Sequence, residues 1–196
     1  MYRALTWWML EQRIDVADAD MVAAAATRPS VEAGTNPAAP TITVDGADVS
    51  APIRDRRISN AVSAVARVPA VRAHLIAQQR EIIATACAEA GGIVAEGRDI
   101  GTVVAPDAAV KVFLTASEAA RASRRAADLA TDPAATVEVT RTEQERRDRM
   151  DAGQSGRAPD AVAIDSTALG VAEVIGEIVS LARQTGLDVI NLDGPA

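Results

Sequence analysis

Three charged side chains stand within four residues near the middle of the chain: Glu96, Arg98 and Asp99. They lie between the apolar runs 91–95 and 102–104, and this pattern predicts a buried strand, a charged turn, and then a second strand or a loop. Charges at the carboxyl end of a strand in an open α/β sheet often face a ligand, so a site for an anion and a metal ion is one interpretation. A self-contained surface ion pair is the alternative, because ion pairs in glycine-rich turns are common and weak.

The elements around this turn must hold it in place, and their order indicates an α/β fold. Continuous apolar runs predict strands at 109–114 and 161–165, and helical spacing of apolar residues predicts helices between them. Helices that alternate with strands imply a parallel sheet, and a strand as apolar as 109–114 is expected to be buried on both faces. The predicted helices cover 1–27 with a turn at 15–20, 53–66, 71–90, 140–151 and 171–183, and one more follows the N-cap segment Thr115-Ala116-Ser117-Glu118.

The segment 28–50 differs from the rest of the chain because prolines and glycines interrupt it. These residues break helices, while the alternating run 41–44 followed by Asp45 and Gly46 predicts a short hairpin. We therefore expect this segment to form a small lobe beside the main sheet.

The composition narrows the function classes. The 196 residues carry a formal net charge of −7, which argues against binding to nucleic acid, because such a surface normally needs a basic face. The amino terminus lacks the pattern of a signal peptide, and no apolar run reaches membrane-spanning length. The only cysteine, Cys87, fits a reducing compartment and is expected to be a small buried side chain. We expect a cytoplasmic protein with neither nucleic acid nor membrane as a partner.

Arginines stand on the predicted helices that follow the charged turn. Arg121, Arg124 and Arg125 lie on neighbouring faces of one helix, and more arginines lie among acidic residues in 140–151. A guanidinium fork matches a phosphate and carboxylates can hold Mg²⁺, so arginines beside the Arg98-Asp99 turn suggest phosphoryl transfer. A solvated helix face carries similar charges, so charge alone does not decide between the two readings.

Taken together, these motifs resemble those of bacterial cytidylate kinases, P-loop enzymes that phosphorylate CMP and dCMP with ATP. The resemblance runs through nearly the whole chain, and it is specific because several separate motifs occur in the family's order. The motifs are Met1-Tyr2-Arg3, Ile58-Ser59-Asn60-Ala61-Val62-Ser63, Val68-Pro69-Ala70-Val71-Arg72, Glu96 to Val104 with Pro106-Asp107-Ala108, Phe113-Leu114-Thr115-Ala116-Ser117, and Arg147-Asp148-Arg149-Met150-Asp151.

This resemblance implies a P-loop-kinase-like parallel sheet flanked by helices, in one domain over residues 1–196. It also implies a small CMP-binding insert at about 28–72 and a lid region at about 121–157. The implied reaction is phosphoryl transfer from ATP to CMP or dCMP, giving CDP or dCDP, with Mg²⁺ as cofactor, ATP as co-substrate and a monomeric protein. A non-catalytic protein that binds pyrimidine nucleotides is the alternative, and an acidic helical interaction module without a ligand is a third.

Individual roles also follow from the resemblance. Arg98, Asp99 and Arg147 are implied as the catalytic residues, with Asp99 on the magnesium side, directly or through water. Arg121 and Arg124 are implied as contacts of ATP. The implied substrate contacts are Tyr2, Arg3, Ser63, Arg72, Glu96, Arg98 and Asp151, of which Ser63, Arg72 and Glu96 serve the base and Asp151 the ribose.

Two departures from the family pattern bear on activity. Gln154 stands where the family's lid has a further arginine, and Arg157 is a candidate replacement. A phosphate-binding loop needs a lysine after its glycines, whereas the only lysine here, Lys111, lies in a predicted strand without that pattern. We therefore expect the first strand and the phosphate loop to be missing, and the chain to be an inactive or weakly active N-terminally truncated form.

The final segment, 189–196, resembles the family's first strand and the opening of its phosphate loop but stops before the lysine. Chance similarity, a permuted gene arrangement and a misplaced start are three explanations. A misplaced start is the one favoured for the front end, because the chain begins inside a predicted helix.

Overall fold

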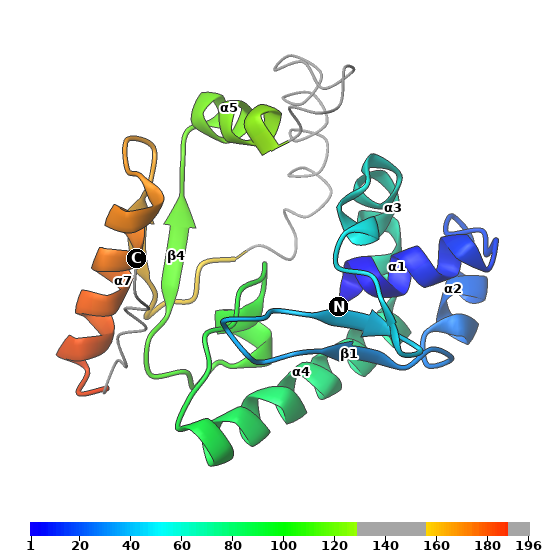
Figure 1. Ribbon diagram of the computed structural model, residues 1–196, viewed down its shortest axis with the longest axis horizontal. Coiled ribbons are helices and arrows are strands. Elements are labelled where there is room, and N and C mark those ends of the chain that lie inside the picture. The colour runs from blue at the N-terminus through cyan, green and yellow to red at the C-terminus, as the bar shows by residue number, and fades with distance from the viewer. Residues whose placement is uncertain (129–155, 188–196) are drawn as a thin grey trace. The chain divides into compact units, whose positions relative to one another are not determined.

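The computed structural model describes residues 1–128 and 156–187 (Figure 1), so the predicted helix at 140–151 lies outside the described residues. The chain divides into two compact units, Met1–Glu96 and Gly97–Ala196, and each has its own sheet. A single domain over the whole chain therefore stays a prediction. Within the described ranges, no helix combines the length and the apolarity that crossing a membrane requires.

The first unit packs helices around a small antiparallel sheet. Asp45 and Gly46 join two of its strands with φ angles of 50° and 81°, as a two-residue type I′ turn requires, so the predicted hairpin is confirmed. The predicted helices are confirmed as well, and the longest begins at Pro69 because proline suits the first turn of a helix. The elements are α1 (Tyr2–Glu11), α2 (Ala19–Ala25), β1 (Val31–Ala33), β2 (Ile42–Val44), β3 (Ala47–Asp48), the 3₁₀ turn η1 (Pro52–Arg54), α3 (Arg56–Ala66) and α4 (Pro69–Ala90).

The second unit contains a parallel pair of strands. The strands β4 (Val112–Thr115) and β5 (Val162–Asp165) pair in register, with Thr115 opposite Asp165 at the carboxyl edge. Each strand leads into a helix at that edge: α5 (Glu118–Asp128) follows β4, as Figure 1 shows, and α7 (Val171–Gln184) follows β5. The parallel pairing that the alternation of helices and strands predicted is therefore confirmed.

The strand predicted at 91–95 is wrong, and the segment 102–104, for which a strand or a loop was predicted, is a helical turn. Residues 91–95 form no strand, and Val94 is 91% exposed, because an apolar run alone cannot supply the hydrogen-bonding neighbour that a strand needs. Residues 102–104 belong to a π-helical turn, η2 (Ile100–Val104), in which the amide of Val103 donates to the carbonyl of Asp99 at 2.8 Å.

Two burial predictions are also wrong. β4 is shorter than the predicted strand 109–114, and its Leu114 is 52% exposed, so this strand is not buried on both faces among the described residues. Cys87 is exposed on α4 rather than buried, although its neighbour Ala86 on the same turn is buried. Continuous hydrophobicity therefore overstated the burial of both segments.

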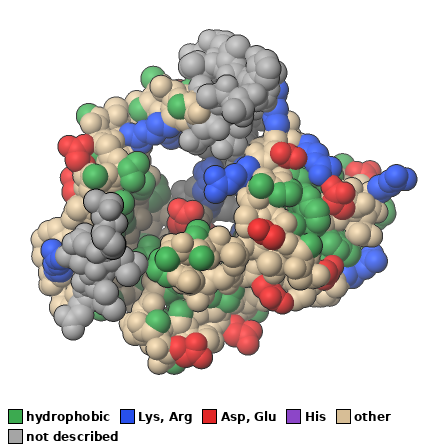
Figure 2. All heavy atoms as spheres, viewed as in Figure 1, with side chains coloured by type: hydrophobic (Ala, Val, Ile, Leu, Met, Phe, Trp, Pro, Cys, Tyr) green, Lys and Arg blue, Asp and Glu red, His purple; other side chains and the backbone are tan. Residues whose placement is uncertain are grey.

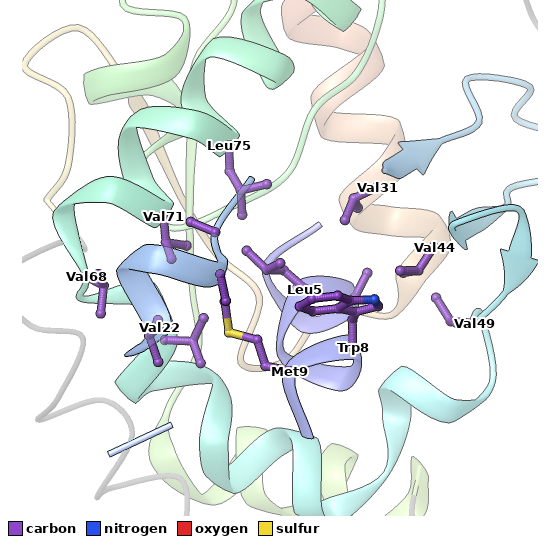
Figure 3. Packing of buried hydrophobic residues seen from close by; sticks show 14 residues of the cluster. Leu5, Trp8, Met9, Val22, Val31, Val44, Val49, Val68, Val71 and Leu75 are labelled. Atoms are coloured by element: carbon purple, nitrogen blue, oxygen red, sulfur yellow. The ribbon is translucent and has the colours of Figure 1, made fainter. Parts of the chain in front are cut away.

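The core of the first unit gathers around α1. Leu5 and Met9, one helical turn apart, are fully buried, as expected for an apolar stripe at helical spacing. Figure 3 shows Met9 turned toward Val22, while the ring of Trp8 lies toward the valines of the small sheet. One helix thus holds α2, α4 and the hairpin to a single apolar centre.

A polar anchor fixes the hairpin to this core. The indole Nε1 of Trp8 donates to Asp45 Oδ2 at 3.1 Å, and the amide of Ser30 donates to Asp45 Oδ1 at 2.8 Å. The guanidinium of Arg28 lies over the Trp8 ring, 5.2 Å from its centroid, which is within the range of a cation–π contact. The turn residue Asp45 therefore has both carboxylate oxygens engaged by the core helix and the chain before β1.

Acidic and basic side chains are mixed over the side of the molecule that Figure 2 shows. Among the described residues drawn there, no broad basic face is visible, which agrees with an excess of 27 acidic over 20 basic residues in the sequence.

We expect Asp45→Asn to destabilise the chain by about 1–3 kcal/mol. Asparagine tolerates the positive φ, but only one end of its side-chain amide is an acceptor. Its NH₂ group would therefore face the N–H of Trp8 or of Ser30, and one hydrogen bond would be replaced by two donors that face each other. Urea unfolding followed by tryptophan fluorescence measures the change. Asp20→Asn, which alters another carboxylate of the same unit, is the control, and equal midpoints for the two variants would contradict the anchoring role of Asp45.

Candidate functional site

The segment around Arg98 and Asp99 is shaped by its neighbours. A Cβ atom added at Gly97 would lie 2.9 Å from Ile100 Cγ1, so the close approach requires glycine. Asp99 begins the π-helical turn, accepts backbone hydrogen bonds on its carbonyl, and is only 7% exposed. Arg98, next to it, is exposed. An exposed arginine thus directly precedes a buried aspartate in the chain, and these two residue types can contact a phosphate and a cation.

In the first unit, one predicted substrate contact, Arg3, is held against helix α3. Its Nη1 donates to the carbonyl of Ile53 at 2.6 Å, and both Nη1 and Nη2 donate to Ser59 Oγ, at 3.1 and 2.9 Å. Ser63 lies one turn further along α3 on the same face and is buried like Ser59. The structure therefore brings Arg3 and the face of Ser63 together.

The other predicted contacts of the first unit lie at the ends of elements. Tyr2 is half-buried in the first turn of α1, and Arg72 is half-buried in the first turn of α4. Glu96 is exposed and is the last residue of this unit. Arg147 and Asp151, together with Gln154, lie outside the described residues, so their predicted roles stay predictions.

The carboxyl edge of the β4–β5 pair carries a polar network. Ser166, 2% exposed, donates from Oγ to the carbonyl of Thr115 at 2.9 Å, and its amide donates to the same oxygen at 2.7 Å. The hydroxyl of Thr167 donates to Asp165 Oδ1 at 2.6 Å and accepts from the amide of Ser117 at 2.9 Å. Hydrogen bonds from the hydroxyl of Thr167 and from its backbone amide lower the pKa of the Asp165 carboxyl. The two loops that leave the strands are thereby joined.

The arginines of α5 reach this edge in different ways. Arg124 donates from Nη1 to Ser166 Oγ at 3.1 Å, and from Nη2 to the carbonyls of Ser166 and Leu169, at 2.5 and 3.1 Å. Arg121, one turn earlier, is half-buried, and its amide donates to the carbonyl of Ser117. The side chain of Arg125 lies outside the described residues. The predicted ATP contact Arg124 therefore grips the loop after β5.

Lys111 has a structural environment rather than that of a phosphate-loop lysine. Its side chain is only 8% exposed, its stem lies against Gly101, and its Nζ is 2.5 Å from Asp160 Oδ2. This hydrogen bond lowers the pKa of the exposed Asp160 carboxyl. An ion-pair partner, Asp160, therefore holds the ammonium of Lys111.

Arg157, the candidate replacement for a lid arginine, contacts the backbone near the start of β5. Its Nε and Nη2 both donate to the carbonyl of Ala161, at 3.0 and 2.7 Å. Ala161 precedes β5, so this contact is at the amino edge of the strand pair, whereas ligands of α/β sheets bind at the carboxyl edge. The replacement role is not tested by this contact and stays a prediction.

The donor set around Asp99 fits Mg²⁺ bound together with a nucleotide. Among the described residues, no group of three or more His, Cys, Asp or Glu side chains gathers as a metal cage. Mg²⁺ does not need such a cage, because it is commonly held by one or two carboxylates, waters and substrate phosphates. One buried carboxylate, that of Asp99, therefore meets the minimal protein contribution that Mg²⁺ needs.

Sequence reasoning did not single out several residues of these sites as partners of one another. Ser166 and Thr167 lie in the segment between the predicted strand 161–165 and the predicted helix 171–183, and Ser59 lies within a motif. The run Asp165-Ser166-Thr167 directly after a predicted strand was the available signal, since short polar residues there can bond to neighbouring backbone. The long-range partner Arg124 had no local signal.

The chain is similar to known proteins over nearly its whole length. Residues 1–184 match the family model described as cytidylate kinase. A protein named cytidylate kinase from Streptomyces griseus subsp. griseus is 48% identical over 186 residues, covering 93% of this chain and 78% of that protein. Proteins of the same name from Mycobacterium avium and Geobacillus kaustophilus are 43% and 41% identical, each covering 94% of this chain and 81% and 82% of their own lengths.

We expect Lys111→Met to lower the urea midpoint at pH 7, because methionine keeps the stem packing but removes the ammonium. The pKa of Asp160 is lowered in the folded chain, so the pair stabilises the fold above the unfolded-state pKa of about 3.9 and stops doing so as the pH falls through the folded value. At pH 3 and below, the difference in urea midpoint between Lys111→Met and the unaltered chain should therefore become smaller or change sign. A deficit that stays constant from pH 7 to pH 2 would contradict the ion pair, and Asp160→Asn should reproduce the pH 7 result.

Proposed function

Because the chain belongs to the cytidylate kinase family, we propose that it transfers a phosphoryl group from ATP to CMP or dCMP, giving CDP or dCDP. The observation that carries this proposal is the segment in which exposed Arg98 precedes buried Asp99 at a turn that requires Gly97. Phosphoryl transfer needs cations to spread the charge of the transferred group and little covalent participation by the protein. An arginine and an aspartate at consecutive positions supply residue types that match that need.

The acceptor nucleotide is proposed to bind mainly to the first unit. Ser63 is buried on the face of α3 that also holds Arg3, so a base and a phosphate could be met by neighbouring polar groups. The full proposed set of substrate contacts is Tyr2, Arg3, Ser63, Arg72, Glu96, Arg98 and Asp151.

The transfer step is proposed to use Arg98, Asp99 and Arg147. Arg98 would neutralise the transferred phosphoryl group, and Asp99 would hold Mg²⁺ directly or through water. Mg²⁺, when bound, supplies charge neutralisation for the phosphates of the two nucleotides. Burial of Asp99 limits its own motion, so its carboxylate can stay in one orientation while the substrates enter.

The proposed ATP site includes Arg121. It also needs a lysine of the phosphate-loop pattern, which these 196 residues do not contain. Their only lysine, Lys111, is paired with Asp160 and packed on Gly101. We therefore expect slow turnover from these 196 residues by themselves. The insert at about 28–72, the lid at about 121–157, a single domain, a monomer and a cytoplasmic location, which the lone Cys87 fits, are parts of the same proposal.

A coupled assay with CMP, ATP and Mg²⁺ tests the activity, with CMP binding followed separately by calorimetry. We expect CMP-dependent formation of ADP, and a loss of about 100-fold or more in kcat for Arg98→Ala. Ser180→Ala, an exposed serine of α7, is the control with unchanged rate. Binding of CMP without any turnover would favour a non-catalytic nucleotide-binding protein, and absence of both would overturn the proposal.

The acceptor contact is tested by Ser63→Ala. Removing one hydrogen bond to the base should raise the KM for CMP by about 3- to 10-fold while kcat changes little, because the contact is the same before and during transfer. The KM for ATP should not move. An equal change in the KM for both nucleotides would show that the variant disturbs α3 as a whole, and no change in either would remove Ser63 from the site.

A further inference from the structure

The guanidinium of Arg124 spans the loop that connects β5 to α7. It meets this loop at both ends, at Ser166 where the strand has just ended and at Leu169 just before α7 begins. The contacts join residues 42 and 45 positions apart in the chain. Arg124 thus fastens the connection between β5 and α7 to helix α5.

The geometry of this contact limits what else Arg124 can hold. A guanidinium grips a phosphate bidentately either end-on, through Nη1 and Nη2, or side-on, through Nε and Nη2. Both forks use Nη2, whose two hydrogens are directed at the carbonyls of Ser166 and Leu169. Arg124 therefore cannot offer a phosphate a fork without releasing the loop.

The same contact is continuous with the end of β4. The Ser166 hydroxyl accepts from Arg124 Nη1 and donates to the carbonyl of Thr115, so a chain of hydrogen bonds runs from α5 through the β5 loop to β4. Thr167 and Ser117 add a second link between the same two loops. The carboxyl edge of the strand pair, where α/β folds bind ligands, is thus held by one connected network.

We propose that Arg124 is a positioning residue, which acts on the donor nucleotide through the loop Ser166 to Leu169 and not by contact with its phosphates. The proposal rests on the kinase function proposed above for its nucleotide, and it departs from the role in ATP contact that the family resemblance implies for this arginine. Arg121 remains the phosphate-facing candidate of α5.

Hydrogen–deuterium exchange on the full chain tests the fastening without any reliance on activity. The amide of Ser166 donates to the carbonyl of Thr115, and the amide of Leu169 donates to the carbonyl of Ser166. The amide of Gly170 donates to Glu173 Oε2 at 2.7 Å, so all three amides should exchange slowly. Arg124→Ala should speed their exchange by about fivefold or more, since part of the local stability is lost. Arg183→Ala, which removes an arginine of α7, should leave this loop unchanged. Unchanged exchange in Arg124→Ala would overturn the proposal.

A double-mutant cycle separates positioning from direct contact. Arg124→Ala should raise the KM for ATP by about 3- to 10-fold with little change in kcat or in the KM for CMP, and Ser166→Ala should reproduce part of that rise. If Arg124 acts through Ser166, the double variant is no worse than Arg124→Ala alone. Arg124→Lys should not rescue, because an ammonium cannot reproduce the fork that spans the loop.

Three results would overturn the proposal: additive effects of the two substitutions, rescue of the KM for ATP by Arg124→Lys, or a normal KM for ATP in Arg124→Ala. Either of the first two results would indicate that Arg124 contacts the phosphates of ATP directly. If the unaltered chain shows no kinase activity, only the proposed kinase function is overturned. The amide exchange rates then still decide whether Arg124 holds the loop between β5 and α7.

Discussion

The buried hydroxyl of Ser166 ties together the only two strands that the structure describes in the second unit. It donates to the end of β4 while its own chain leaves β5, and it accepts from Arg124 on the following helix. Parallel strands cannot be joined by a tight turn, so each must be held where it leaves the sheet. The positions of the loops before α5 and α7 depend on this one side chain, which the burial of the site keeps away from water.

In the first unit, too, polar side chains hold neighbouring segments in place. Its helix α1 supplies the apolar centre through Leu5 and Met9, and polar contacts from the same helix then fix what surrounds it. Trp8 holds the hairpin turn through Asp45, and Arg3 holds α3 through Ser59. A proposed binding surface on α3 is therefore oriented by the helix that also forms the core.

Three arginines of this chain make hydrogen bonds that fix neighbouring segments. Arg124 and Arg157 donate to backbone carbonyls, and Arg3 donates to the carbonyl of Ile53 and the hydroxyl of Ser59. A charged donor makes a stronger hydrogen bond than a neutral one, so each of these contacts helps to hold the segment that it meets.

The sequence by itself determined the helices that the structure describes, the hairpin at Asp45-Gly46, the parallel pairing and the family, because spacing, turn residues and motif order are local or additive signals. It did not predict the absence of a strand at 91–95 or the partners of Arg124 and Lys111, and the local π-helical turn at Ile100–Val104 has no spacing signal that was used. The partners of Arg124 and Lys111 lie tens of positions away in the chain, and a strand depends on a neighbour with which it can pair. Only the tertiary structure brings such groups within reach of one another.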